Sequence, residues 1–360
     1  MRALVTPSIE SLRPYEAGKP VEELARERGI TDAVKLASNE NPHGPSPKAV
    51  DAMRGALAEV SRYPDANAYR LRARIAEVLG VTMPEVVQGN GSNELLDLLV
   101  RTFTTPADHI VFAEPSFVVY RMSALTHGVA FTAVPLANDV HDLEAMARAI
   151  TEKTRLVFVA NPNNPTGTHV GRAALERFLR AVPKDVVVAL DEAYAEYADA
   201  PDYASALSLR ALHERLVVLR TFSKIYGLAA LRVGYAVSTP EICDYLNRVR
   251  APFNVSSLGQ VAALASLDDA AHVERSRKQN SAERARLSSS LAALGFGVTE
   301  SQANFVYARS PLPAKELYEA LLDRGVIVRA FGGLPDHVRI TVGTRAENDR
   351  LVAALREVLK

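Results

Sequence analysis

The sequence predicts an α/β fold: a large domain with a mostly parallel sheet and helices on both faces, then a smaller α+β domain. Short continuous apolar runs, typical of strands buried on both faces, recur through the first two thirds of the chain. Helical patterns such as Leu95–Phe103 lie between several of them, and this alternation is typical of α/β folds. The runs are Val86–Val87, Ile110–Ala113, Leu156–Ala160, Val186–Leu190, Leu216–Leu219 and Val233–Val237.

Changes in composition divide the chain into three parts. Residues 1–45 are rich in Pro, Gly and Asn around one expected helix at Val21–Arg28, and they read as an arm. Residues 46–252 form the expected large domain, whose last helix stops at Pro252. Residues 253–360 form the expected small domain. Its elements are a helical stretch to about Leu294, strands at Phe305–Ala308, Val326–Val328 and Val338–Val342, and helices at Lys315–Arg324 and Glu347–Leu359.

Composition and charge exclude several classes of protein. Hydrophobic residues make up 48% of the 360 residues and charged residues 23%, which are ordinary values for a globular chain. The 42 basic residues balance 42 acidic ones, so no overall field recruits nucleic acid or a membrane surface. One cysteine, Cys243, and a start broken by Pro7 and Pro14 predict a cytoplasmic protein without a signal peptide.

Two familiar kinds of site have little support. The 8 histidines are scattered without the spacing of metal ligands, so we expect no metal site. Gly89–Gly91 begins like a dinucleotide-binding turn, but Glu94 stands where the third glycine belongs.

Four polar segments at strand ends are more informative. The first, Gly89–Glu94, opens a helix, so the backbone N–H groups of Ser92 and Asn93 would face an anion at its positive end. The alternative is an ordinary helix start capped by Ser92. The second, Asn161–Gly167, places three asparagines and two prolines at the carboxyl end of a strand, where open α/β sheets bind ligands.

The other two segments supply an acid and an amine. Asp191–Tyr194 follows an apolar strand, and burying the acid there costs free energy unless it is paired. The alternative is that the acid caps a helix. In Thr221–Gly227, continuing to Arg232, Lys224 lies between Phe222 and Ile225. Partial desolvation would lower the pKa of Lys224 and make its amine a nucleophile.

An anion cradle, a buried acid, an amine and an amide loop are the parts that hold pyridoxal 5′-phosphate. In their order and separation these segments resemble the fold-type I aminotransferases, and most closely the histidinol-phosphate aminotransferase family. The resemblance covers nearly the whole chain and extends to Leu12–Tyr15, Lys35–Pro42, Arg62–Asp65, Leu228–Gly234 and Arg339–Thr344. It implies a seven-stranded sheet in the large domain and an arm that packs with the small domain.

The resemblance also implies a role for each matching residue. Lys224 would form the Schiff base, Asp191 would pair with the ring nitrogen, and Tyr194 and Asn164 would bind the ring hydroxyl. Phe117, where many relatives have Tyr, would stack on the ring. The phosphate would be held by Ser92, Asn93, Thr221, Ser223 and Arg232, with Tyr63 from the partner chain of a homodimer. The substrate phosphate would be taken by Arg339, Arg329 and Tyr15, with Asn164 also near the substrate.

The expected reaction exchanges an amine between histidinol phosphate and 2-oxoglutarate, giving glutamate. Two alternatives on the same scaffold remain, an aromatic amino-acid aminotransferase and a threonine-phosphate decarboxylase, because the fork of Arg339 suits a carboxylate as well as a phosphate. A ligand-binding module without catalysis is disfavoured by the intact Lys224, Asp191 and Arg232.

Overall fold

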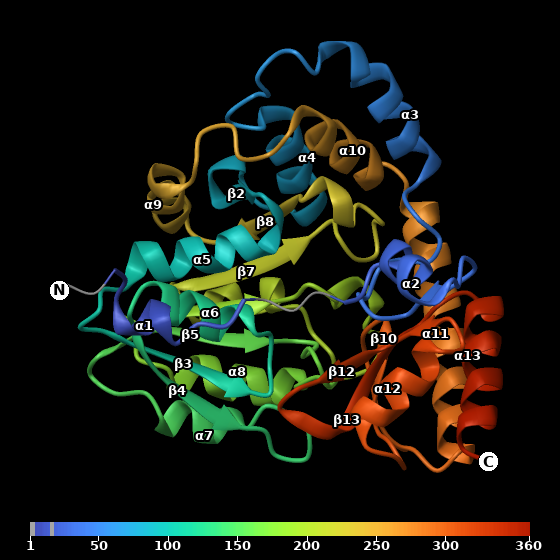
Figure 1. Ribbon diagram of the computed structural model, residues 1–360. Helices are drawn as coiled ribbons and strands as arrows, with labels where there is room; N and C mark the ends of the chain where they lie inside the picture. Colours follow the sequence, from blue (N-terminus) through green and yellow to red (C-terminus); the bar gives the residue numbers. More distant parts are fainter. Residues whose placement is uncertain (1–3, 15–17) are drawn as a thin grey trace.

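The computed structural model describes residues 4–14 and 18–360 and contains a large and a small sheet (Figure 1). The large sheet has seven strands in the order β2-β8-β7-β6-β5-β3-β4. As the resemblance implied, the fold is α/β with this sheet at its centre. In sheet order the strands are β2 (Val86–Gly89), β8 (Gly234–Val237), β7 (Leu216–Thr221), β6 (Val187–Asp191), β5 (Thr154–Ala160), β3 (His109–Glu114) and β4 (Ala130–Pro135).

The direction of β8 corrects the sequence interpretation. Val233–Val237 was expected to be a parallel strand, but β8 runs antiparallel to both β2 and β7. Parallel neighbours need a long crossover, usually a helix. The segment 222–233, which is described throughout, holds instead the short 3-10 helix η5 (Ala229–Leu231). A strand that is buried on both faces has a continuous apolar run whether it is parallel or antiparallel to its neighbours. The apolar pattern therefore does not predict the direction of the strand.

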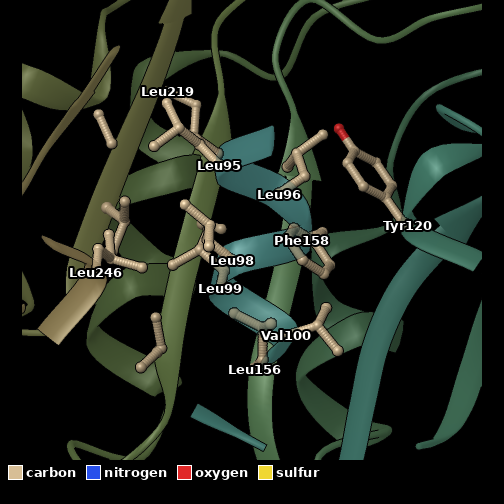
Figure 2. Packing of buried hydrophobic residues seen from close by; sticks show 14 of the residues in the cluster. Leu95, Leu96, Leu98, Leu99, Val100, Tyr120, Leu156, Phe158, Leu219 and Leu246 are labelled. Atoms are coloured by element: carbon tan, nitrogen blue, oxygen red, sulfur yellow. The ribbon is translucent and has the colours of Figure 1, made fainter. Parts of the chain in front are cut away.

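Alternate residues of the strands pack into two cores on opposite faces of the sheet. On one face Leu156 and Phe158 meet α5 (Gly91–Phe103), α6 (Val119–Thr126) and α9 (Pro240–Val249), as Figure 2 shows for α5. On the other face Val157 and Val159 meet the second helical layer. That layer consists of α7 (Leu143–Arg148), α8 (Arg172–Ala181) and η4 (Ala206–Leu212). Helices thus cover both faces of the sheet, and the ends of its strands are the positions left for a functional site.

Edge strand β4 was missed by the sequence analysis. Only Val134 among its residues is fully buried. Such a strand lacks the continuous apolar run by which the central strands were found.

The small sheet lies beside the large one and has four antiparallel strands in the order β12-β13-β10-β9. They are β12 (Arg329–Phe331), β13 (Leu334–Thr341), β10 (Phe305–Arg309) and β9 (Gly297–Thr299). The helices α11 (Ala270–Ala293), α12 (Ala314–Leu322) and α13 (Arg345–Val358) share its hydrophobic core. The expected strands are present, although Val326–Ile327 pairs with the arm and not with this sheet. The helices near the end of the chain are also present, whereas the helical stretch expected to about Leu294 is interrupted at Asp268–Asp269. The short β9 and β12 were not predicted.

The arm is tied to the small sheet's side of the molecule. In it β1 (Val34–Lys35) pairs in parallel with β11 (Val326–Ile327), and α2 (Val21–Arg28) buries Leu24 against Leu322 and Ile327. The helix α2 has the bounds that the sequence predicted. The short α1 (Pro7–Glu10) precedes it.

Helix α10 (Ser257–Leu267) packs on the large-sheet side, against α3 (Pro47–Ala56) and α4 (Tyr69–Leu79). Its Ala262 and Ala263 share a core with Ala49 and Leu71, and these small side chains permit close approach of the helices. The division of the chain at residues 45 and 252 stays a proposal. In the described parts of the chain, no helix is long and apolar enough to cross a membrane. The remaining short helices are η1 (Leu57–Glu59), η2 (Met83–Glu85) and η3 (Ala195–Tyr197).

Candidate active site

A cavity of about 200 Å³ opens where β5, β6 and β7 end, between the two sheets. Its wall combines strand ends of the large sheet, arm residues such as Ser38 and Asn39, and arginines of the small sheet. Twelve residues singled out from the sequence line it: Ser92, Asn93, Phe117, Asn164, Asp191, Tyr194, Thr221, Ser223, Lys224, Arg232, Arg329 and Arg339. The fold therefore brings together motifs that are far apart in the chain.

Asp191 is the last residue of β6 and is 5% exposed. Its Oδ2 accepts a hydrogen bond from the Tyr120 hydroxyl at 2.8 Å, and its Oδ1 accepts one from the Ala193 N–H at 3.1 Å. Burial raises the pKa of the Asp191 carboxyl, and these two donors and the Lys224 charge oppose that rise. The sequence analysis missed Tyr120, although a tyrosine in a buried helix face usually has a partner for its hydroxyl.

Lys224 follows β7 in a turn that is anchored by buried neighbours. Phe222 and Ile225 are fully buried, which leaves the half-buried lysine facing the cavity. Its Nζ donates to the Ser38 carbonyl at 3.4 Å and lies 5.5 Å from the centre of the Tyr194 ring. The amine is thus held by a neutral acceptor from the arm.

An anion cradle forms around the start of α5. Arg232 has a left-handed backbone (φ 53°), and its Nη1 donates to Ser223 Oγ and to the Ala229 carbonyl, both at 3.1 Å. A Cβ on Gly91 would lie 2.3 Å from Arg232 Nη2, so the guanidinium packs directly on the first turn of α5. Within residues 4–14 and 18–360, Arg232 makes no ion pair with a carboxylate. A cation against a positive helix end fits an anionic ligand there.

The start of α5 differs from the alternative in which Ser92 caps the helix. Ser92 was considered as the helix cap, but α5 begins at Gly91 with Asn90 at the N-cap position. Ser92 lies inside the first turn, and Glu94 Oε2 accepts from the Asn90 N–H at 2.5 Å. Ser92 is therefore available to a ligand.

The three asparagines of the loop after β5 have different roles. The amide of Asn161 exchanges two hydrogen bonds with the backbone of Val170, and Asn163 Nδ2 donates to Thr166 Oγ1 at 2.9 Å. These two amides hold the loop itself. Of the loop's three asparagines, Asn164 is the one that lines the cavity, where its Oδ1 accepts from Arg339 Nη1 at 2.6 Å.

Two arginines form the wall opposite the strand ends. Arg329 and Arg339 are directly paired residues of β12 and β13, so their side chains leave the small sheet on the same face. Arg339 is 9% exposed, and its Nη2 donates to the Ala37 carbonyl at 2.7 Å. The pair places two guanidinium groups at this end of the cavity.

Tyr194 is also held by the arm. Its hydroxyl oxygen accepts from Asn39 Nδ2 at 3.0 Å, and Asn39 has a left-handed backbone (φ 56°) that is fixed by Thr341. The sequence analysis quoted the motif around Asn39 without giving it a role. No local signal points to a contact between positions 155 apart.

One expected site residue lies away from the cavity of its own chain, and another falls outside the described residues. Tyr63 is 83% exposed and stacks on Phe253, and it is not among the residues that line the cavity of its own chain. Tyr15 lies outside the described residues. Among the residues that the structure does describe, no three His, Cys, Asp or Glu side chains are grouped so as to hold a metal.

Comparison with known proteins gives the family. The sequence profile described as "Aminotransferase class I and II" matches residues 31–355. The chain belongs to this family. The aminotransferase is 51% identical over 360 residues to a histidinol-phosphate aminotransferase of Anaeromyxobacter sp., with 99% of both chains covered. It is 49% identical to one of Moorella thermoacetica, with 98% of this chain and 92% of the relative covered.

A solved structure agrees with these sequences. Histidinol-phosphate aminotransferase from Sinorhizobium meliloti, in complex with pyridoxal-5′-phosphate, superposes on the aminotransferase with a TM-score of 0.91 at 30% identity. The match covers 100% of this chain and 98% of the other. The aminotransferase is thus a pyridoxal-phosphate-dependent enzyme of fold type I. Its cavity fits that cofactor, because an anion cradle, a buried acid and a lysine amine face one space.

The Asp191→Asn variant should fold and lose roughly 10²-fold or more in turnover, because it removes the negative charge that would stabilise a protonated ring nitrogen. Asp185→Asn is the matched control, since Asp185 is exposed and precedes the amino end of the same strand. Steady-state rates at saturating substrate measure the effect. Turnover close to that of the unmodified enzyme in Asp191→Asn would contradict the role.

The Gly91→Ala variant should weaken binding of pyridoxal phosphate, because its Cβ would displace the Arg232 guanidinium. Loss of one hydrogen bond to a charged group costs about 1.5–3 kcal/mol. Gly29→Ala is the control: Gly29 has a similar φ of 70° with nothing within 4 Å of its Cβ. Both variants carry backbone strain, but only Gly91→Ala should change the dissociation constant, measured by titrating the cofactor-free protein. Equal constants in both variants would show that the clash does not reach the cradle.

Proposed function

We propose that this enzyme exchanges an amino group between L-histidinol phosphate and 2-oxoglutarate, giving imidazole-acetol phosphate and glutamate in histidine biosynthesis. The observation that carries the proposal is the arginine pair Arg329 and Arg339, in the same cavity as Lys224 and Asp191. The likeness to histidinol-phosphate aminotransferases over nearly the full length supports it.

The arginine pair favours a phosphate ester over an amino acid as substrate. Like charges opposite each other on neighbouring strands repel, which raises the free energy of the folded protein. A phosphate carries about −1.5 to −2 charges and three acceptor oxygens, so one group can accept hydrogen bonds from both guanidiniums. A carboxylate of an aromatic amino acid carries one charge and two acceptor oxygens.

The residues of the cavity divide the chemistry among them. When bound, pyridoxal phosphate supplies an aldehyde that takes up amines and a ring that accepts electrons. The Lys224 amine removes a proton from the substrate carbon that carries the amino group, and it returns one in the opposite half-reaction. Asp191 would hold a buried carboxylate for the ring nitrogen, Phe117 would stack on the ring, and Tyr194 would offer its hydroxyl to the ring oxygen.

We also propose a homodimer whose chains share their active sites. The segment from η1 to α4 exposes several large apolar side chains, an arrangement that marks interaction surfaces. Leu57 is 55% exposed, Val60 59% and Tyr69 61%. Tyr63 stacks on Phe253 at 4.7 Å between ring centres, and a second copy on this surface would bury both and receive Tyr63 at its cofactor phosphate. With its one cysteine buried and reduced, we place the dimer in the cytoplasm.

The substrate assignment predicts a clear order of specificity constants. Histidinol phosphate should exceed phenylalanine as amino donor, because the arginine pair is matched by a phosphate. Threonine phosphate should undergo no decarboxylation. Side-by-side kinetics with 2-oxoglutarate measures the order, and a higher kcat/KM for phenylalanine would support the aromatic aminotransferase instead.

Arg339→Lys should lower kcat/KM for histidinol phosphate by roughly 10-fold or more, since lysine keeps the charge but loses the planar fork. Histidinol, which lacks the phosphate, should be a poor donor that loses far less. Arg309→Lys is the control, because Arg309 lies on neighbouring β10 and is paired with Asp336 at an exposed site. Equal losses for the two donors would assign Arg339 to structure rather than to the substrate phosphate.

The shared site predicts that two inactive proteins restore activity together. Lys224→Ala lacks the amine, and Tyr63→Asp would place a negative charge beside the partner's cofactor phosphate. In a mixed dimer one site has an intact Lys224 and an intact Tyr63, and the other has both defects. Activity should reappear at one site in each mixed dimer after subunit exchange, measured against each variant alone. Mixed dimers without activity would rule out the shared site.

A further inference from the structure

Tyr120 contacts the carboxylate of Asp191, and the proposed mechanism gives it no role. It lies in α6, outside the strand-end motifs, and is fully buried. Its hydroxyl is 2.8 Å from Asp191 Oδ2. A carboxylate has no proton to give, so the tyrosine donates. The hydrogen bond is charge-assisted and shielded from water, which makes it stronger than a neutral one.

The Tyr120 ring is fixed by other aromatic side chains. It stacks on Phe158 with 4.7 Å between ring centres and an angle of 5° between planes. It meets Phe117 edge-on, with 5.9 Å between centres and an angle of 89°. Figure 2 shows Tyr120 at the margin of the cluster, beside Phe158. The hydroxyl therefore has little freedom to turn away from the carboxylate.

We propose that Tyr120 is a positioning residue that acts through Asp191, holding its carboxylate ionised and in one orientation for the ring nitrogen of the cofactor. Each carboxylate oxygen has one protein donor, Tyr120 for Oδ2 and the Ala193 N–H for Oδ1, so the plane of the carboxylate is set. The inference rests on the proposed role of Asp191.

The charges around Asp191 show why a donor matters. Burial and neighbouring Glu192 raise the pKa of Asp191, whereas Tyr120, Ala193 and Lys224 lower it. Tyr194 is the other titratable group nearby, and burial raises its pKa, so it stays neutral. Burial likewise raises the pKa of Tyr120 well above its ordinary value, so its proton stays in place. Removing this donor would raise the pKa of Asp191 further, so the carboxyl would become protonated at a higher pH than in the unmodified protein.

The test is Tyr120→Phe, which keeps the ring and its packing. Two readouts are measured: the affinity of the cofactor-free protein for pyridoxal phosphate from pH 5 to 9, and kcat and KM of the loaded enzyme. Affinity should fall at least about tenfold at acidic pH, and the pH at which it begins to fall should move upward. The loss of activity should appear in kcat rather than in KM. Tyr307→Phe, a buried tyrosine of β10 in the small sheet, should match the unmodified protein.

A double-mutant cycle separates positioning from a merely structural role. If Tyr120 acts through the carboxylate, Tyr120→Phe should change little in an Asp191→Ala background. An equal loss in both backgrounds, or an unshifted pH profile, would overturn the proposal for Tyr120 alone. Unchanged cofactor affinity and turnover in Asp191→Ala itself would overturn the role of Asp191, and with it the basis of both proposals.

Discussion

Among the described residues, one carboxylate, that of Asp191, lines the cavity between the sheets together with four basic side chains: Lys224, Arg232, Arg329 and Arg339. Like charges in a partly buried space repel strongly, because the local dielectric is low. Hydrogen bonds to backbone carbonyls stabilise three of these cations. Lys224 donates to Ser38, Arg339 to Ala37 and Arg232 to Ala229. Backbone carbonyls carry no net charge, so these hydrogen bonds orient the cations without adding a negative charge to the cavity.

The arm is the element on which this arrangement depends. Asn41 Nδ2 donates to the Ile225 carbonyl at 2.7 Å, directly after the lysine, and Asn304 Nδ2 donates to the Asn39 carbonyl at 3.0 Å. The same stretch pairs with β11. It thus connects the lysine turn of the large sheet to the small sheet. The arm is part of the active site, although its composition resembles that of a surface loop.

The local pattern of apolar residues predicted most of the strands and helices. The polar segments that follow the apolar runs predicted most of the residues that line the cavity. Asp191 was singled out because an acid at the end of a buried strand is costly unless it is paired, and Lys224 because Phe222 and Ile225 flank it. Tyr120 and Asn39 were missed because their partners are distant in the sequence. Tyr120 contacts Asp191, 71 positions away, and Asn39 contacts Tyr194, 155 positions away, and the residues next to them in the sequence predict neither contact. The direction of β8 was missed because burial, not direction, determines an apolar run. Tyr63 is different again, since its expected ligand belongs to a second chain.

The tie between the arm and the C-terminal strands also sets an order of assembly. The hydrogen bond from the Asn39 N–H to Thr341 joins positions 302 apart, so it forms only after residue 341 has left the ribosome. The residues of the large sheet end at Val237 and emerge much earlier. During synthesis the scaffold is therefore available first, and the pocket for the cofactor is closed last. Only a polypeptide that extends past residue 341 can close this pocket.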